Sequence, residues 1–175
     1  RRRQRQMCIR DRIQLEQNII SKKTFLCLGL DTDIDKIPKH LLNSQDPVFD
    51  FNKSLIDRLS SKIVAVKINT AFYESRGKDG WSSLEKSIDY IKSNHPDLFT
   101  IADAKRADIG NTSEMYAKAF FEKMNFDSIT LSPDMGQDSV TEFLKYDDKY
   151  AIILALTSNQ LSLIHISEPT RRRTI

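Results

Sequence analysis

The stretch LFTIADAKRADIGNT, residues 98–112, decides the fold. Its first five residues form an apolar run that is typical of a strand covered on both faces of a sheet. Asp103, Lys105 and Asp108 follow directly, with spacings of two and three residues. In parallel α/β proteins the sites are built where strands end. The stretch therefore predicts a parallel strand that delivers charged side chains to a site.

Four further apolar runs have the same character and predict strands at residues 24–30, 62–68, 126–131 and 150–156. Cys27 lies in the first of these runs and is predicted to be a small buried hydrophobe. Helical apolar spacing fills the intervals, at residues 47–60, 81–94, 112–124 and 138–145, with Asp46 as N-cap and Pro47 at the first helical position. Strands that alternate with helices predict a parallel sheet with right-handed crossovers. An open nucleotide-binding sheet is disfavoured, because no Gly-rich loop follows the first strand.

The composition is that of a soluble, single-domain protein, with 39% hydrophobic and 29% charged residues. No apolar run is long enough to span a membrane, and no signal-peptide pattern is present. The two cysteines, Cys8 and Cys27, suggest neither a disulfide framework nor a metal site. We therefore expect a cytoplasmic protein that is not bound to a membrane.

The net charge of +3 comes from the two ends of the chain. Residues 1–12 hold six arginines and one aspartate, and residues 161–175 add Arg171, Arg172, Arg173 and Glu168, which leaves a mildly acidic body. The body has no basic or aromatic pattern for nucleic acid, so we expect no nucleic-acid partner. Both ends resemble translated sequencing-adapter read-through. We therefore predict a foreign tail at 1–12, the folded domain at 13–160 and a second foreign tail at 161–175.

The pattern Asp103-x-Lys105-x-x-Asp108 resembles the orotidine 5′-phosphate decarboxylase suprafamily. Other stretches resemble the longer bacterial subtype of the decarboxylase, in the correct order: residues 29–31, 67–74, 131–139 and 156–159. The resemblance implies a (β/α)₈ TIM barrel, of which about five βα units are present here. A full barrel needs roughly 250 residues, so we expect that this chain is truncated at its C-terminal side.

The resemblance also implies the reaction, which converts orotidine 5′-phosphate to UMP in the last step of de novo UMP synthesis. Loss of carbon dioxide leaves a carbanion at pyrimidine C6, which has no ring electron sink and must be stabilised by electrostatics. The implied catalytic residues are Lys105, Asp103, Asp108 and Lys67, with Lys105 stabilising the carbanion and then protonating it. No metal ion or organic cofactor is implied.

The implied substrate-binding residues are Asp31, Asn69, Ile109, Thr112, Thr130, Pro133 and Ser158. In the family, the positions of Asp108, Ile109 and Thr112 reach into the site of the partner subunit, so the resemblance implies a homodimer with shared active sites. Asp31 and Lys67 would hold the ribose hydroxyls, and Ser158 would contact the pyrimidine ring.

The family holds the substrate phosphate with residues that follow the seventh and eighth strands, and this chain reaches neither. We therefore expect the chain by itself to be inactive and poorly soluble, since an unfinished barrel exposes two strand edges. Two alternatives stay open. One is a magnesium-dependent sugar-phosphate decarboxylase or aldolase of the same suprafamily, and the other is a non-catalytic nucleotide-binding fragment.

Overall fold

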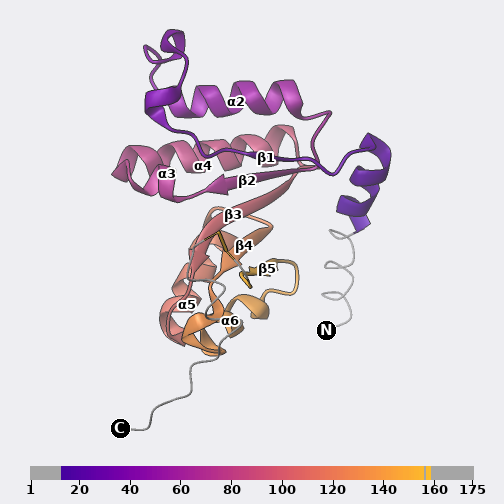
Figure 1. Ribbon diagram of the computed structural model, residues 1–175, viewed down its shortest axis with the longest axis vertical. Coiled ribbons are helices and arrows are strands. Elements are labelled where there is room, and N and C mark those ends of the chain that lie inside the picture. Colours follow the sequence, from indigo (N-terminus) through magenta and orange to yellow (C-terminus); the bar gives the residue numbers. More distant parts are fainter. Residues whose placement is uncertain (1–12, 156, 159–175) are drawn as a thin grey trace.

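The computed structural model describes residues 13–155, 157 and 158, and its centre is a five-stranded parallel sheet in the order β1-β2-β3-β4-β5 (Figure 1). The strands are β1 Cys27–Gly29, β2 Ala65–Asn69, β3 Phe99–Arg106, β4 Ser128–Leu131 and β5 Tyr150–Ile153. Each strand pairs in parallel with the next one along the chain. The predicted parallel sheet, built from strands that alternate with helices, is confirmed.

Helices connect the strands in the predicted places, and the short helix α3, which was not predicted, follows β2. They are α2 Pro47–Leu59, α3 Ala71–Glu74, α4 Gly77–Asn94, α5 Gly110–Ala117, the π-helix η3 Lys118–Lys123 and α6 Asp138–Thr141. Four 3₁₀ turns complete the connections: η1 Ile34–Lys36, η2 Lys39–Leu41, η4 Pro133–Met135 and η5 Phe143–Lys145. None of the described helices is both long enough and apolar enough to cross a membrane.

Helix α2 begins as its sequence predicts. The Asp46 side chain accepts a hydrogen bond from the backbone N–H of Phe49, at 3.1 Å, and Pro47 takes the first helical position. An aspartate at this position satisfies one of the N–H groups that the first turn of a helix leaves without a partner. The predicted N-cap is therefore confirmed.

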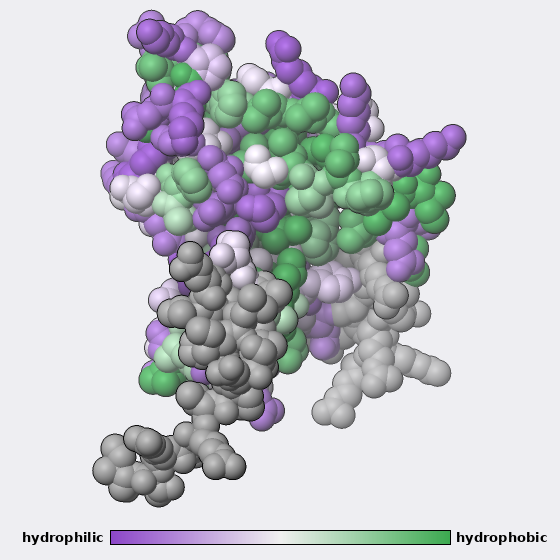
Figure 2. All heavy atoms as spheres, viewed as in Figure 1, coloured by the Kyte–Doolittle hydropathy of each residue, from purple (hydrophilic) through white to green (hydrophobic). Residues whose placement is uncertain are grey.

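The two outer strands are not buried on both faces, so that prediction is wrong for β1 and also for β5, in which Ile152 is 37% and Ile153 is 44% exposed. Phe25 is 83% exposed and Leu26 is 58% exposed, and Cys27 is exposed as well. The reason is that β1 is an edge strand, which pairs only with β2 among the described residues. Figure 2 shows apolar side chains gathered on the upper part of the molecule, in the region where Figure 1 places α2 and β1. In the described part of the chain, β1 and β5 each pair with one neighbouring strand.

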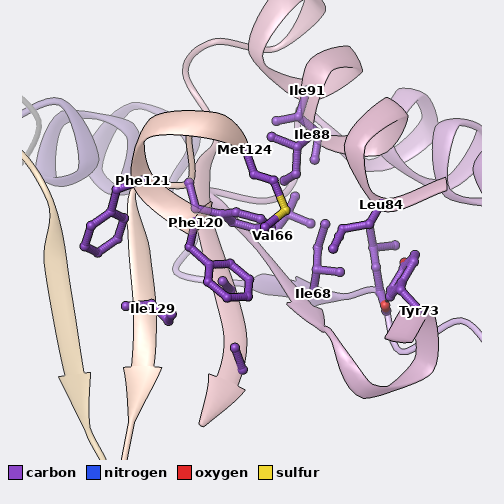
Figure 3. Close-up of a cluster of buried hydrophobic side chains, with 14 of the residues drawn as sticks. Val66, Ile68, Tyr73, Leu84, Ile88, Ile91, Phe120, Phe121, Met124 and Ile129 are labelled. Atoms are coloured by element: carbon purple, nitrogen blue, oxygen red, sulfur yellow. The ribbon is translucent and has the colours of Figure 1, made fainter. Parts of the chain in front are cut away.

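The core lies between the sheet and its helices. Figure 3 shows Leu84, Ile88 and Ile91 of α4 near Val66 and Ile68 of β2, and all five side chains are buried. Phe120, Phe121 and Met124 belong to the same buried cluster, and Figure 3 shows Met124 reaching toward Val66 of β2 and Ile88 of α4. This layer fixes the strands laterally and therefore fixes where their C-terminal ends lie.

Residues 13–22 form a helix that the sequence did not predict. Its last residue, Lys22, donates to the carbonyls of Ser60 and Ile63 and to Asp97 Oδ2, at 2.8, 3.0 and 2.7 Å. These partners precede β2 and β3, so the helix lies at the N-terminal end of the strands. The charged residues lie at the opposite, C-terminal end of the strands.

Candidate active site

The register of the sheet brings the predicted charged residues together. Lys67 of β2 pairs with Gly29 of β1, and Asn69 of β2 pairs with Asp103 of β3. Strands of a parallel sheet end at the same edge, so side chains near these ends share one surface. Asp31, Lys67, Asp103 and Lys105 meet there, although they are far apart in the sequence.

These four side chains form a continuous chain of alternating charges. Lys67 Nζ lies 3.1 Å from Asp31 Oδ1 and 3.2 Å from Asp103 Oδ2, and Lys105 Nζ lies 2.6 Å from Asp103 Oδ1. Asp103 is the most enclosed member, with 12% of its side chain exposed, while half of the Lys105 side chain is exposed. The Lys105 side chain is therefore accessible to solvent, while the enclosed carboxylate of Asp103 holds its ammonium group.

The two central members stay ionised at neutral pH. Burial alone raises the pKa of Asp103, but hydrogen bonds from Lys105 and Lys67 outweigh it and hold that pKa below its usual value. Burial likewise opposes the charge of Lys67, yet hydrogen bonds to Asp31 and Asp103 raise the pKa of Lys67 above its usual value. Opposite neighbours favour the charged form of each group, so the site presents fixed charges.

Thr130 of β4 forms hydrogen bonds to Asp103 and Lys105 of this chain of charges. Its Oγ1 accepts a hydrogen bond from the backbone N–H of Lys105, at 2.9 Å, and donates one to Asp103 Oδ1, at 3.1 Å. Thr130 is 6% exposed. The structure thus gives it contacts to two other site residues, in addition to the substrate-binding role that the sequence predicts.

Lys105 has an unusual backbone. Its φ angle is +47°, in the left-handed region, and the pairing of β3 with β4 shifts register between Ala102 and Arg106. A left-handed conformation costs a residue with a side chain roughly 1–2 kcal/mol, and such strain is typical of functional sites. The irregular pairing lies at the residue for which the sequence predicts the central role.

Asp108, Ile109 and Thr112 lie at the start of α5 and are not joined to the chain of charges. Asp108 Oδ1 accepts a hydrogen bond from the backbone N–H of Ile109, at 2.7 Å, and no ion pair joins Asp108 to another residue in the described part of the chain. Ile109 is 56% exposed. The three residues therefore form a surface beside the site of their own chain.

The other predicted binding residues lie around the same edge. Asn69 Oδ1 accepts a hydrogen bond from the backbone N–H of Ala71, at 3.2 Å, and Pro133 begins η4 after β4. Ser158 is exposed and follows β5. Arg171, Arg172 and Arg173 lie outside the described residues, as do the tails predicted at 1–12 and 161–175.

A network of buried hydrogen bonds involves Leu30 and Thr32, the two residues that flank Asp31, and it was not predicted from the sequence. Thr32 Oγ1 donates to Asn52 Oδ1 at 2.6 Å, and Asn52 Nδ2 donates to Tyr73 Oη at 2.9 Å. The Tyr73 hydroxyl in turn donates to the carbonyl of Leu30, at 3.0 Å. Asn52 lies four residues from Val48 and from Ile56 on the buried face of α2. A polar residue at such a position is the signal that could have revealed the network.

The described residues contain no group of three or more His, Cys, Asp or Glu side chains arranged to hold a metal ion. What the site offers is an ammonium group held on a carboxylate and exposed on one side. Such a group can stabilise developing negative charge on a bound molecule and can donate a proton to it.

Comparison with known proteins gives a consistent result. The model of the orotidine 5′-phosphate decarboxylase / HUMPS family matches residues 24–174. This match includes residues 161–174, which the sequence analysis predicts to be foreign. Among curated proteins, the orotidine 5′-phosphate decarboxylases of Flavobacterium johnsoniae and Phocaeicola vulgatus are each 60% identical over 147 residues. Each alignment covers 84% of this chain and 54% of the relative. The chain thus spans about half the length of the curated relatives it matches.

Solved structures give the same picture. A crystal structure from Toxoplasma gondii, described as an orotidine-monophosphate decarboxylase, has a TM-score of 0.81 and 32% identity, over 90% of this chain and 52% of that one. The Leishmania donovani OMP decarboxylase has a TM-score of 0.72 and 32% identity, over 87% of this chain and 56% of that one. The five strands and their helices therefore correspond to part of a TIM barrel.

Proposed function

Because the chain belongs to the orotidine 5′-phosphate decarboxylase / HUMPS family, we propose that the full-length protein containing it converts orotidine 5′-phosphate to uridine 5′-phosphate. It would act as a carbon–carbon lyase in the cytoplasm and would need no metal ion or organic cofactor. The observation that carries the proposal is the chain of charges Asp31–Lys67–Asp103–Lys105. This chain of charges would supply a fixed ammonium group to stabilise the carbanion.

The reaction breaks the bond between pyrimidine C6 and its carboxylate. The electron pair stays on C6, carbon dioxide leaves, and a proton must then reach C6. An ammonium group about 3 Å from the carbanion contributes a Coulomb attraction of about 5 kcal/mol at an effective dielectric constant of about 20. Lys105 supplies this charge and then the proton, and it regains a proton from water.

Asp103 and Lys67 keep Lys105 in place during this step. Asp103 Oδ1 accepts a hydrogen bond from Lys105 Nζ at 2.6 Å, and Asp103 Oδ2 accepts one from Lys67 Nζ at 3.2 Å. This arrangement fixes the ammonium group before the substrate binds, so little reorganisation is needed in the transition state. Asp103 would also lie near the substrate carboxylate, and these like charges would separate as carbon dioxide leaves.

The remaining predicted residues would bind the substrate. Asp31 and Lys67 would hold the ribose hydroxyls, and Asn69, Thr130, Pro133 and Ser158 would line the nucleotide. Asp108, Ile109 and Thr112, of which Ile109 is exposed and the other two are partly buried, would complete the site of a second subunit in a homodimer. Ile109 is 56% exposed, and covering its side chain in such a dimer would remove apolar surface from water.

The test is turnover of orotidine 5′-phosphate by the full-length protein, followed by the absorbance change on conversion to uridine 5′-phosphate. We expect Lys105→Met to abolish turnover. The matched control is Lys118→Met, which removes a lysine that pairs with Glu114 at 2.7 Å on the surface of α5, and it should keep full activity. Equal activity of the Lys105→Met and parent proteins would refute the mechanism.

Two further measurements separate the alternatives. Turnover that survives removal of magnesium with EDTA supports the decarboxylase, whereas loss of turnover would favour the magnesium-dependent relatives of the suprafamily. Binding of uridine 5′-phosphate without any turnover would favour a non-catalytic nucleotide-binding protein.

We also propose the domain boundaries given above, with foreign tails at 1–12 and 161–175 around the barrel domain at 13–160. The genomic sequence that follows codon 159 tests this boundary. A reading frame that departs from residues 161–175 and continues with further strands is expected, and a genomic match to these residues would overturn the proposal.

A further inference from the structure

Arg106 is a charged residue next to Lys105 that the proposed mechanism does not use. Its Nη2 pairs with Glu74 Oε1 of α3, and its Nη1 donates to the carbonyl of Ala104 at 3.1 Å. Its guanidinium carbon lies 5.1 Å from the centre of the Tyr116 ring and 5.3 Å from that of Phe120. One side chain therefore connects the end of β3 to α3, to α5 and to the π-helix that follows α5.

The side chain of Arg106 is a largely buried cation with an ion-pair partner. Only 19% of its side chain is exposed, and its Nε is buried with no hydrogen-bond partner among the described residues. Burying a charge is costly unless the charge is paired, and a surface arginine would face water. The ion pair with Glu74 and the two aromatic rings offset this cost and fix the plane of the guanidinium.

Because Arg106 directly follows Lys105, the contacts that fix Arg106 also restrain the backbone of Lys105. Lys105, directly before it, has the left-handed φ angle of +47°, and the register of β3 against β4 shifts by Arg106. A strained residue returns to an ordinary conformation unless its neighbours hold it. On one side, the backbone N–H of Lys105 is held by Thr130 Oγ1. On the other side, the backbone carbonyl of Arg106 accepts from Ser132 N–H at 3.0 Å.

We propose that Arg106, locked by Glu74 and the Tyr116 and Phe120 rings, is a positioning residue that holds the strained backbone of Lys105. The side chain of Arg106 points into the helix layer, so it does not touch the open site itself. Its effect is to keep the Lys105 ammonium on Asp103, at the point where the carbanion would form. The catalytic part of this inference rests on the proposed function, but the structural part does not.

The structural part is tested by hydrogen exchange in the full-length protein. The variants are Glu74→Gln, which removes the charge without changing the shape, and Arg106→Met, which keeps an unbranched stem. Both should make the Lys105 amide exchange at least about tenfold faster. The amide of Leu30, which donates to the Lys67 carbonyl at 2.8 Å, serves as the internal reference and should keep its rate. The matched control is Glu114→Gln, which removes another carboxylate that pairs with a lysine.

The catalytic part is tested by steady-state kinetics of the same variants. A misplaced Lys105 lowers kcat by on the order of 10- to 100-fold, while KM stays within about twofold because the substrate-binding groups are untouched. Arg106→Lys should not restore kcat, since an ammonium lacks the flat fork that fits both Glu74 and the rings. Glu114→Gln should keep the kcat of the parent.

The outcomes are distinguishable. Lys105 exchange and kcat that match those of the Glu114→Gln control would overturn the proposal, and so would a loss confined to KM. If Arg106→Met does not fold, the isosteric Glu74→Gln variant still decides the question. If the parent does not turn over orotidine 5′-phosphate, the proposed function fails, while the exchange of the Lys105 amide still tests whether Arg106 holds that backbone.

Discussion

Thr130 shows how much of this site depends on a single hydroxyl. It accepts from the Lys105 backbone and donates to Asp103, so it fixes two of the four charged residues from the neighbouring strand. The sequence predicts Thr130 as a substrate-binding residue, and the two roles lead to different kinetics. A residue that binds substrate equally in the ground state and the transition state changes KM, whereas a residue that orients the catalytic groups changes kcat.

We predict that Thr130→Val lowers kcat of the full-length protein about tenfold or more and costs about 1–3 kcal/mol of unfolding free energy. The reason is that the isosteric valine leaves the partly buried backbone N–H of Lys105 without an acceptor. Thr130→Ser keeps the hydroxyl and should stay near the parent in kcat. Steady-state kinetics and urea unfolding of both variants provide the measurement. A Thr130→Val protein that changes only in KM would assign the residue to substrate binding instead.

At the scale of the elements, strand order and most helices follow from the sequence, because apolar runs and helical spacing alternate clearly along the chain. The helix at residues 13–22 was missed, since it lies next to the segment that was set aside as foreign. The expected burial of the first strand was wrong because a short apolar run does not reveal how many neighbours a strand has. Within the site, the strand ends were predictable, and they bring Lys67, Asp103 and Lys105 together as expected, whereas the ion pair of Asp31 with Lys67 and the separation of Asp108 were not predicted.

Other features of the site depend on three-dimensional packing and could not be predicted. The left-handed backbone of Lys105 depends on the register of β3 against β4, which periodicity does not encode. The pairing of Arg106 with Glu74 joins residues 32 positions apart, on different elements. Both features arise only once the strands and helices have packed.

The buried network beneath Asp31 leads to a prediction about α3. Tyr73 is fully buried, and burial raises the pKa of its hydroxyl to about 12, so the hydroxyl stays protonated and donates to the Leu30 carbonyl. Tyr73→Phe leaves that carbonyl and the Asn52 amide short of a partner. We expect a loss of about 1–3 kcal/mol in urea unfolding, together with a higher KM, because Asp31 lies between Leu30 and Thr32.

The control for this change is Tyr146→Phe, which removes an exposed hydroxyl that donates to Glu122 at 2.6 Å. It should change the unfolding free energy by less than about 0.5 kcal/mol. Equal losses in the two variants would mean that the network under Asp31 contributes no more than an ordinary surface hydrogen bond.

Helices α2 and α4 are also linked at the surface, through Asp57. Hydrogen bonds from Tyr90, Lys53 and His95 lower the pKa of Asp57 to about 2. A carboxyl group with a lowered pKa stabilises the fold above its unfolded pKa of about 3.9, and this contribution is lost as the pH falls toward the folded value.

We therefore predict that Asp57→Asn is less stable than the parent at pH 6, by about 0.5 kcal/mol, since the group is partly exposed. The difference should persist down to about pH 4 and shrink between pH 4 and pH 2. Urea unfolding of both proteins at pH 6, 4 and 3 measures it. A difference that is constant across this range would show that the lowered pKa does not stabilise the fold.

At the scale of the molecule, the two edges of the sheet determine how residues 1–175 behave when they are expressed alone. Phe25 beside β1 is 83% exposed, and Ile153 of β5 is 44% exposed. Parallel edge strands with exposed apolar side chains pair readily with other chains. We predict that the 175-residue chain forms oligomers in size-exclusion chromatography and does not turn over orotidine 5′-phosphate.

The double substitution Phe25→Lys and Ile153→Lys places a charge at each edge and should increase the monomer fraction. Lysine is a common means of protecting edge strands in natural sheets. A parent chain that elutes as a stable monomer would contradict the prediction, and so would a variant that aggregates as much as the parent.

The proposed homodimer makes a quantitative prediction for the full-length protein. If Asp108 acts in the site of the partner subunit, each site takes Lys105 from one subunit and Asp108 from the other. Lys105→Ala and Asp108→Ala homodimers are then both inactive. A mixed dimer contains one site with both defects and one site with neither, so unfolding and refolding an equal mixture should restore about a quarter of the parent activity. If Asp108 instead acts within its own chain, where it lies apart from the ion-paired residues, every site in the mixture carries one defect and no activity returns.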